Sequence, residues 1–199
     1  MTPPGFRLYP QRLDEALQRA LIAEIWSRLD DAPFYRPITR RGPMSVEMTN
    51  LGSLGWVTDE RGYRYVDQHP LTGQAWPPIP TSLLELWTSV ADERAPPDAC
   101  LVNLYRDAAR MGLHQDRDEA DFSFPVMSVS LGDTALFRIG AAARGGPTHA
   151  VRLASGDVCV LAGQARLAFH GVDRIVPGSS RLVPGGGRVN LTLRRAAPV

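Results

Sequence analysis

Apolar residues recur at helical spacing near the start of the chain. Within residues 11–30 a leucine or isoleucine returns at every fourth position: Leu13, Leu17, Leu21 and Ile25. Because this spacing places the side chains on one face of a helix, we expect a first helix over residues 11–30 that packs on a core.

A second helix is predicted after the proline-rich segment 76–80. Ser82 and Glu85 have the spacing of a capping box, which satisfies free N–H groups at the start of a helix. The helix should end near residues 95–97, where two prolines stand. Its apolar positions expected to face the core are Leu83, Trp87 and Val90.

After position 98, short runs of β-forming residues follow one another without helical spacing between them. These runs are residues 100–105, 126–131, 135–139, 151–153, 157–161, 167–170 and 188–194. They predict a mainly β sandwich or barrel, with the earlier helices flanking one face. Residues 33–62, which proline and glycine interrupt repeatedly, predict a lid of irregular segments and short hairpins.

Length and composition fit a single domain, 1–199, with helices and lid in 1–98 and the β core in 99–199. No apolar run approaches the roughly 20 residues that span a bilayer, and the N-terminus lacks the pattern of a signal peptide. We therefore expect a cytoplasmic monomer that makes no contact with membranes. Cys100 and Cys159 stand far apart and are expected in the core. The net charge of +1 decides nothing about nucleic acid.

The main candidate for chemistry is a set of metal-binding residue types. His114 and Asp116 are two positions apart, so on a strand they would share a face, and His170 follows 56 positions after His114. Two histidines and a carboxylate on one face of an octahedron hold non-heme Fe(II) and leave three positions open. A surface turn with an unrelated buried histidine gives the same spacing, so the motif alone leaves both interpretations open.

A polar face on the last predicted strand offers a place for an anion. In residues 188–194, polar and apolar residues alternate, which puts Arg188, Asn190 and Arg194 on one face. The arginines lie roughly 20 Å apart along an ideal strand, so their side chains must converge to bind one small diacid. Asn103 and Tyr105 could donate further hydrogen bonds to its carboxylates. Solvated arginines on an edge strand and a buried tyrosine are the alternatives.

The ordered set of these motifs resembles the AlkB dioxygenases. The resemblance runs from about residue 44 to residue 194 and includes the motifs Asn103-Leu104-Tyr105, His114-Gln115-Asp116-Arg117-Asp118, Ser128-Val129-Ser130-Leu131-Gly132, His170-Gly171 and Arg188-x-Asn190-x-Thr192-x-Arg194. It implies a double-stranded β-helix, or jelly roll. It also implies Fe(II) held by His114, Asp116 and His170, and 2-oxoglutarate held by Asn103, Tyr105, Arg188, Asn190 and Arg194.

The chemistry that the resemblance implies is oxidative dealkylation of N-alkylated bases such as 1-methyladenine and 3-methylcytosine. It consumes O2 and 2-oxoglutarate and releases succinate, CO2 and an aldehyde. The expected partner is alkylated single-stranded or duplex DNA, with RNA as an alternative. A related dioxygenase acting on tRNA or protein, and a 2-oxoglutarate-binding module without turnover, remain open.

Four residues are candidates for binding the damaged base. Trp56 resembles the lid aromatic that stacks on a flipped base, and Tyr63 resembles a contact to the nucleic-acid backbone. Asp118 resembles a base-selectivity carboxylate, because an acid attracts the positive charge of an N-alkylated adenine or cytosine. Arg144 is expected to contact phosphate or the base. A core tryptophan, an exposed hairpin tyrosine and plain surface charge are the alternatives.

Overall fold

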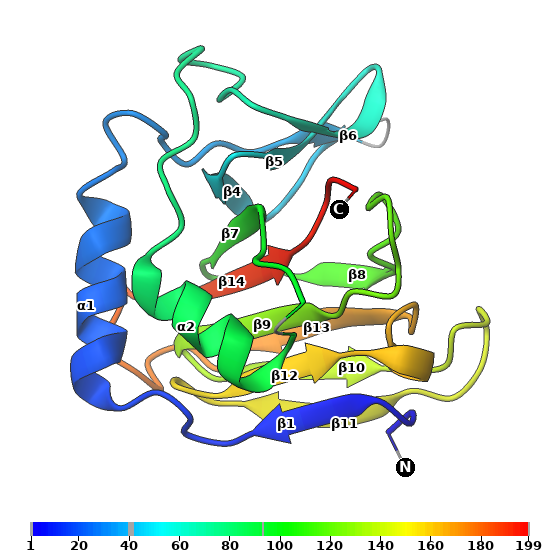
Figure 1. Cartoon of the computed structure of the whole chain (residues 1–199). Helices are drawn as coiled ribbons and strands as arrows, with labels where there is room; N and C mark the ends of the chain where they lie inside the picture. Colours follow the sequence, from blue (N-terminus) through cyan, green and yellow to red (C-terminus); the bar gives the residue numbers. More distant parts are fainter. Residues whose placement is uncertain (1, 40–41, 93, 199) are drawn as a thin grey trace.

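Two β-sheets face each other and form a jelly roll in the computed structural model, which describes residues 2–39, 42–92 and 94–198 (Figure 1). The larger sheet has the order β1-β12-β9-β14-β7-β4. Its strands are β1 (Phe6–Tyr9), β4 (Glu47–Gly52), β7 (Ala99–Tyr105), β9 (Val126–Gly132), β12 (Val158–Leu161) and β14 (Arg188–Arg194). The smaller sheet, β11-β10-β13-β8, contains β8 (Met111–His114), β10 (Ala135–Ile139), β11 (His149–Leu153) and β13 (His170–Ile175).

The larger sheet takes strands from both sides of position 98. β1 pairs with β12, and β4 pairs with β7. β1 was not predicted, and β4 lies within the segment predicted as a lid. The predicted strand 167–170 was misplaced: a 3-10 turn, η1 (Gly163–Ala165), occupies the preceding residues, and β13 begins at His170.

Strand β14 contributes to two different interiors. Its apolar residues belong to the core between the larger sheet and the helices: Val189, Leu191 and Leu193. Its polar residues alternate with these, and Arg188, Asn190 and Arg194 line a pocket together with residues of the smaller sheet. All seven residues of β14 are buried, so the edge-strand alternative is wrong.

Both helices cover the outer face of the larger sheet, at the left and front of Figure 1. Helix α1 spans Glu15–Trp26, and the Asp14 carboxylate accepts a hydrogen bond from Leu17 N at 2.8 Å. The prediction of residues 11–30 was too long at both ends: the Asp14 cap starts the helix after Leu13, and the helix ends at Trp26. Leu13 is buried all the same, while Leu17 is half-buried.

Helix α2 spans Thr81–Val90, so it begins before the predicted capping box and ends earlier than predicted. Pro80 is the N-cap residue and makes no side-chain cap, which means that the capping-box prediction at Ser82 was wrong. Leu83 and Trp87 are buried as predicted, whereas Val90 is half-buried. The Trp87 indole donates to Ala95 O at 3.0 Å and so fastens the chain that follows the helix.

A separate hairpin stands beyond β4, at the top of Figure 1. It consists of β5 (Gly55–Asp59) and β6 (Gly62–Val66), and a smaller pair, β2 (Ile38–Thr39) and β3 (Gly42–Pro43), lies nearby in the sequence. Gly55 packs so closely on the Trp76 indole that an added Cβ would overlap it. In the described part of the chain, no helix is long and apolar enough to cross a membrane.

Candidate active site

Pairing between β8 and β13 sets His114 directly opposite His170. The candidate ligand atoms of His114, Asp116 and His170 all lie within 4.8 Å of one another. The two-residue spacing predicted Asp116 on the same strand as His114, and this was wrong: β8 ends at His114, so Asp116 lies on the segment that follows it. The carboxylate nevertheless reaches the histidines, with Oδ1 3.8 Å from His114 Nε2 and Oδ2 3.6 Å from His170 Nε2.

Backbone carbonyls hold both histidine rings in one orientation. His114 Nδ1 lies 2.9 Å from Gly112 O, and His170 Nδ1 lies 2.9 Å from Ala168 O. A carbonyl can only accept, so each Nδ1 carries a proton, and Nε2 is the ring nitrogen that each histidine turns toward Asp116. This is the usual outer support of a metal-binding histidine.

The protonation states suit metal binding. Burial lowers the pKa of His114 to about 4, with a further contribution from neighbouring His170, so its imidazole is neutral at ordinary pH. Burial acts to raise the pKa of Asp116, but Arg194 and the two histidines hold that pKa well below its usual range. A neutral His114 imidazole and an ionised Asp116 carboxylate result, and together with the His170 ring they form a donor set for Fe(II).

Asp116 has one oxygen engaged and one free. Its Oδ1 accepts a hydrogen bond from Arg194 Nη2 at 2.8 Å, whereas its buried Oδ2 has no hydrogen-bond partner among the described residues. A buried carboxylate oxygen without a partner is costly, and a bound cation would satisfy it. The residues present therefore fit a metal ion.

Between the sheets, Arg188 is a buried cation to which none of the described residues brings a counter-charge at hydrogen-bond distance. Its Nη2 donates to Ser130 Oγ and Asn190 Oδ1, both at 3.0 Å, while Nε and Nη1 have no hydrogen-bond partner among the described residues. Burial lowers the pKa of this guanidinium. Register places Tyr105 opposite Arg188 and Asn103 opposite Asn190, so the structure brings these four predicted residues together. An acidic ligand fits this end of the pocket.

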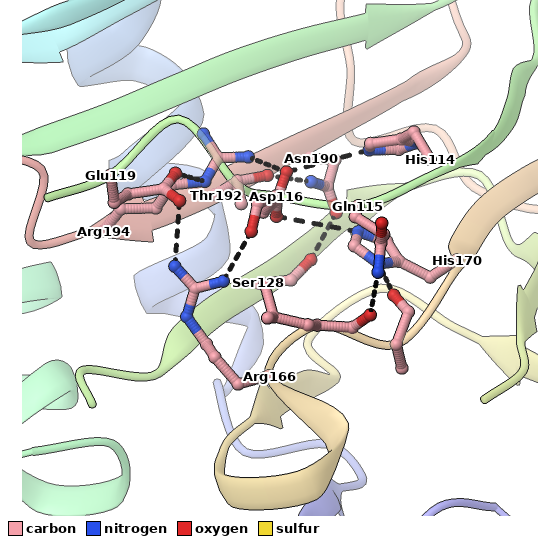
Figure 2. Close-up of polar contacts among 12 residues, drawn as sticks. His114, Gln115, Asp116, Glu119, Ser128, Arg166, His170, Asn190, Thr192 and Arg194 are labelled. Carbon is pink, nitrogen blue, oxygen red and sulfur yellow. Dashed lines mark hydrogen bonds and ion pairs between the residues drawn. The ribbon is translucent and has the colours of Figure 1, made fainter. Parts of the chain in front are cut away.

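The fifth predicted residue of that pocket, Arg194, is bound by the protein's own acids (Figure 2). Besides the Asp116 contact, its Nε lies 3.2 Å from Glu119 Oε1. Glu119 is buried and also pairs with Arg166 at 2.9 Å. Arg166 in turn donates to Asp116 O at 2.7 Å.

Sequence reasoning missed Glu119, Arg166 and the hydroxyl of Tyr65, which donates to Glu119 Oε1 at 2.7 Å. The available signal was weak, since Glu119 follows Asp116 by three positions and Tyr65 follows Tyr63 by two. Gln115 was quoted only as part of a motif. Its amide donates to Ala142 O at 3.1 Å and Leu167 O at 2.6 Å, and this fastens the segment between two candidate ligands.

The four candidates for base recognition lie on the hairpin and two loops. Trp56 and Tyr63 stack on each other with ring centroids 5.3 Å apart, and Trp56 Nε1 donates to Asp118 Oδ2 at 2.9 Å. Trp56 is half-buried, while Asp118 is exposed. Arg144 is also exposed and stands over the Phe169 ring at 5.2 Å, so it is not joined to the other three.

A jelly roll with a His/Asp/His cluster beside an arginine-lined pocket defines a non-heme, metal-dependent oxygenase. The chain belongs to the 2OG-Fe(II) oxygenase superfamily, whose family model matches residues 5–194. Fe(II), 2-oxoglutarate and O2 are the cofactor and co-substrates of that superfamily.

The comparisons place the chain among AlkB-type dioxygenases. It is 66% identical over 194 residues to the alpha-ketoglutarate-dependent dioxygenase AlkB homolog of Caulobacter vibrioides, covering 97% of this chain and 88% of that protein. It is 40% identical over 181 residues to the alpha-ketoglutarate-dependent dioxygenase AlkB of Escherichia coli, covering 88% of this chain and 83% of that protein. The solved structure of OsALKBH1 is 33% identical, with a TM-score of 0.84 over 98% of both chains.

Proposed function

We propose that this dioxygenase removes alkyl groups from N-alkylated bases, such as 1-methyladenine and 3-methylcytosine, in DNA. The observation that supports this substrate is the contact of Trp56, an aromatic platform, with Asp118, an exposed acid two positions after the metal-site residue Asp116. A π-face together with a negative charge suits a flat, cationic base. The names of the similar dioxygenases agree with this proposal.

In this proposal, His114, Asp116 and His170 hold Fe(II). The bound iron, with O2 and 2-oxoglutarate, would supply the oxidising power that converts an N-alkyl carbon into an unstable hydroxylated product. The residues themselves orient and hold charge: their candidate ligand atoms lie within 4.8 Å of one another, and Asp116 Oδ2 has no hydrogen-bond partner among the described residues. No protein nucleophile is required.

The co-substrate would lie along β14, with a different arginine near each of its two carboxylates. Arg194 already contacts Asp116, so it marks the end of the pocket nearest the metal site. Arg188, six positions away, lies at the other end, and two of its N–H donors have no partner in the part of the chain that the structure describes. We therefore propose that Arg188 binds the carboxylate farther from iron, with Asn103, Tyr105 and Asn190 around the co-substrate and Arg194 beside its nearer end.

The damaged base must leave its stack to reach the pocket, so single strands or extruded nucleotides are the expected substrates. Trp56 would stack on the base, and Asp118 would attract its cationic edge. Tyr63, which is 59% exposed, would contact the nucleic-acid backbone, and Arg144 a phosphate.

The test is mass spectrometry of single-stranded oligonucleotides that carry 3-methylcytosine, incubated with protein, Fe(II), ascorbate and 2-oxoglutarate. Loss of one methyl group together with succinate formation supports the proposal, and His170→Ala is the inactive control. RNA, tRNA and methylated peptides serve as competing substrates. Succinate formation on those alone would assign the enzyme to the alternative substrates, and an absence of CO2 release with every substrate would indicate a module without turnover.

We also propose that the protein acts as a monomer in the cytoplasm. The three candidate metal ligands and both co-substrate arginines lie in the described part of one chain and line one pocket, which supports a site built within a single copy. Light scattering of the purified protein during turnover would test this, and an active dimer would contradict it.

A further inference from the structure

Two neighbouring residues of the β5–β6 hairpin bind two consecutive acids of the core. Trp56 on β5 is the cross-strand partner of Tyr65 on β6, so their side chains project from the same face of the hairpin. Trp56 Nε1 donates to Asp118, and the Tyr65 hydroxyl donates to Glu119. Both acids lie on the segment that follows Asp116 directly. The hairpin is thus fastened to the chain beside a candidate metal ligand.

The two contacts differ in how accessible they are. Asp118 is exposed, whereas only 7% of Glu119 is exposed. A hydrogen bond at the surface can be replaced by one to water or to a ligand. A buried carboxylate that loses its donor stays desolvated and unsatisfied, which destabilises the protein. Of the two, the Tyr65–Glu119 contact is therefore the persistent one.

Glu119 connects this contact to the site through a single oxygen atom. Its Oε1 accepts the Tyr65 O–H at 2.7 Å and lies 3.2 Å from Arg194 Nε. Arg194 Nη2 then donates to Asp116 Oδ1 at 2.8 Å, while Oδ2 lies 3.6 Å from His170 Nε2. Two hydrogen bonds and one ion pair therefore connect the hairpin to the metal-site carboxylate.

Because its members are charged and buried, this series of contacts cannot easily change one contact at a time. Asp116 and Glu119 balance Arg166 and Arg194, and all four side chains are buried. If Glu119 moved, Arg194 would lose one of its two counter-charges and draw more strongly on Asp116. The orientation of Arg194 therefore depends on Glu119, and the position of Glu119 depends on Tyr65.

We propose that Tyr65 and Glu119 are positioning residues that link hairpin docking to 2-oxoglutarate binding. The proposal rests on the assignment of Arg194 to the co-substrate pocket and of Asp116 to iron. Because coupling between binding equilibria is reciprocal, 2-oxoglutarate must stabilise the docked hairpin by the same factor by which docking strengthens 2-oxoglutarate binding.

The test uses Tyr65→Phe, which removes one hydroxyl and keeps the ring. Tyr35→Phe is the matched control, because the buried Tyr35 hydroxyl has no hydrogen-bond partner among the described residues. Anaerobic calorimetric titration of the Fe(II)-loaded protein should show 2-oxoglutarate binding weakened roughly threefold to tenfold in Tyr65→Phe, the effect of about one hydrogen bond, and unchanged in Tyr35→Phe.

Amide hydrogen exchange of residues 55–66 provides the readout that a merely structural tyrosine would not change. Added 2-oxoglutarate should slow exchange in the wild-type hairpin by roughly the same threefold to tenfold and have little effect in Tyr65→Phe. The proposal would be overturned if wild type and Tyr65→Phe bound 2-oxoglutarate with equal affinity. It would also be overturned if 2-oxoglutarate left the amide exchange rates of the wild-type hairpin unchanged.

Arg194→Ala separates this failure from failure of the underlying site assignment. If Arg194→Ala weakens 2-oxoglutarate binding and Tyr65→Phe does not, the pocket is correctly placed and the link to the hairpin is wrong. If neither variant weakens binding, the placement of the pocket itself is wrong. No oligonucleotide is present, so both results are independent of the nucleic-acid substrate.

Discussion

The indole N–H of Trp56 donates a hydrogen bond to the carboxylate of Asp118, with Nε1 and Oδ2 2.9 Å apart. The ring proposed to stack on the base and the acid proposed to read its charge are thus bound to each other across 62 positions of sequence. The Trp56 hydrogen bond uses Oδ2 of Asp118, so Oδ1 is the oxygen that a base entering beside Trp56 could contact. Changes at the two residues should consequently influence each other, yet remain separable by the chemistry they remove.

Asp118→Asn should reduce discrimination between cationic and neutral lesions more than it reduces overall binding. The substitution removes the negative charge and keeps the shape, so the Coulomb attraction for 3-methylcytosine is lost and 1-methylguanine, a neutral lesion, is little affected. Repair rates for both lesions in the same strand measure this. Equal losses on the two lesions would show that the carboxylate supports the site without reading charge.

Trp56→Ala should weaken oligonucleotide binding by roughly 1 to 3 kcal/mol, the value of one base stacked on an aromatic ring. Substrate-free turnover of 2-oxoglutarate should change little, because Trp56 does not line the co-substrate pocket. Fluorescence anisotropy and succinate formation measure the two effects. Trp56→Phe keeps a ring but not the donor to Asp118. Its oligonucleotide affinity should therefore lie between those of the wild type and Trp56→Ala. Unchanged binding in Trp56→Ala would exclude the stacking role.

His170→Ala should abolish turnover and weaken Fe(II) binding while leaving the fold intact, as judged by circular dichroism. The reason is that its Nε2 is one of three ligand atoms gathered within 4.8 Å. Mn(II) and Co(II) should bind the wild type without supporting oxidation, because binding needs the right ligands whereas O2 activation needs iron. Undiminished Fe(II) affinity in His170→Ala, measured by anaerobic titration, would remove His170 from the metal site.

Arg188→Ala should weaken 2-oxoglutarate binding by roughly 1.5 to 3 kcal/mol, about one to two decades, since a charge-assisted contact is lost. Lysine should restore only part of the affinity because it cannot form the paired contacts of a guanidinium. Arg19→Ala is a matched control, since Arg19 is exposed on α1 and pairs with Glu15. A loss of affinity no larger than that of the control would place the distal carboxylate elsewhere.

Acidification should destabilise the metal-free protein through His114. Its folded pKa of about 4 lies below the ordinary value of 6.5, so between these values the unfolded chain binds the proton and the folded chain does not. The free energy of unfolding should fall as pH is lowered from about 6.5 to about 4. Urea denaturation across this window measures the slope. His114→Asn should show a shallower slope, and an identical slope would contradict the assigned pKa.

The predictions from sequence were most accurate where a periodic pattern coincides with a buried strand. The alternation in residues 188–194 was confirmed, because β14 has an apolar interior on one side and a polar pocket on the other. Predictions from residue patterns failed at the ends and N-caps of the helices. The local pattern favoured Ser82 because its hydroxyl can cap a helix, whereas the N-cap of helix α2 is Pro80, whose side chain makes no cap hydrogen bond.

The buried ion network could not be predicted from sequence for a different reason. Tyr65 and Arg194 contact Glu119 from 54 and 75 positions away, so no local spacing relates them. Their proximity follows from sheet register and from the irregular segment after β8. An isolated glutamate in a loop has the same local sequence whether it is solvated or buried, and tertiary packing decides between the two.

Arg188 carries a consequence for the folded population of the protein. A buried guanidinium with two idle donors is a cost to the native state, and it is absent from the unfolded chain. A dicarboxylate that binds only the folded protein offsets this cost, by about 2.7 kcal/mol at a hundred times its Kd. The supply of a central carbon metabolite would then set not only how fast the enzyme turns over but also how long each molecule survives proteolysis.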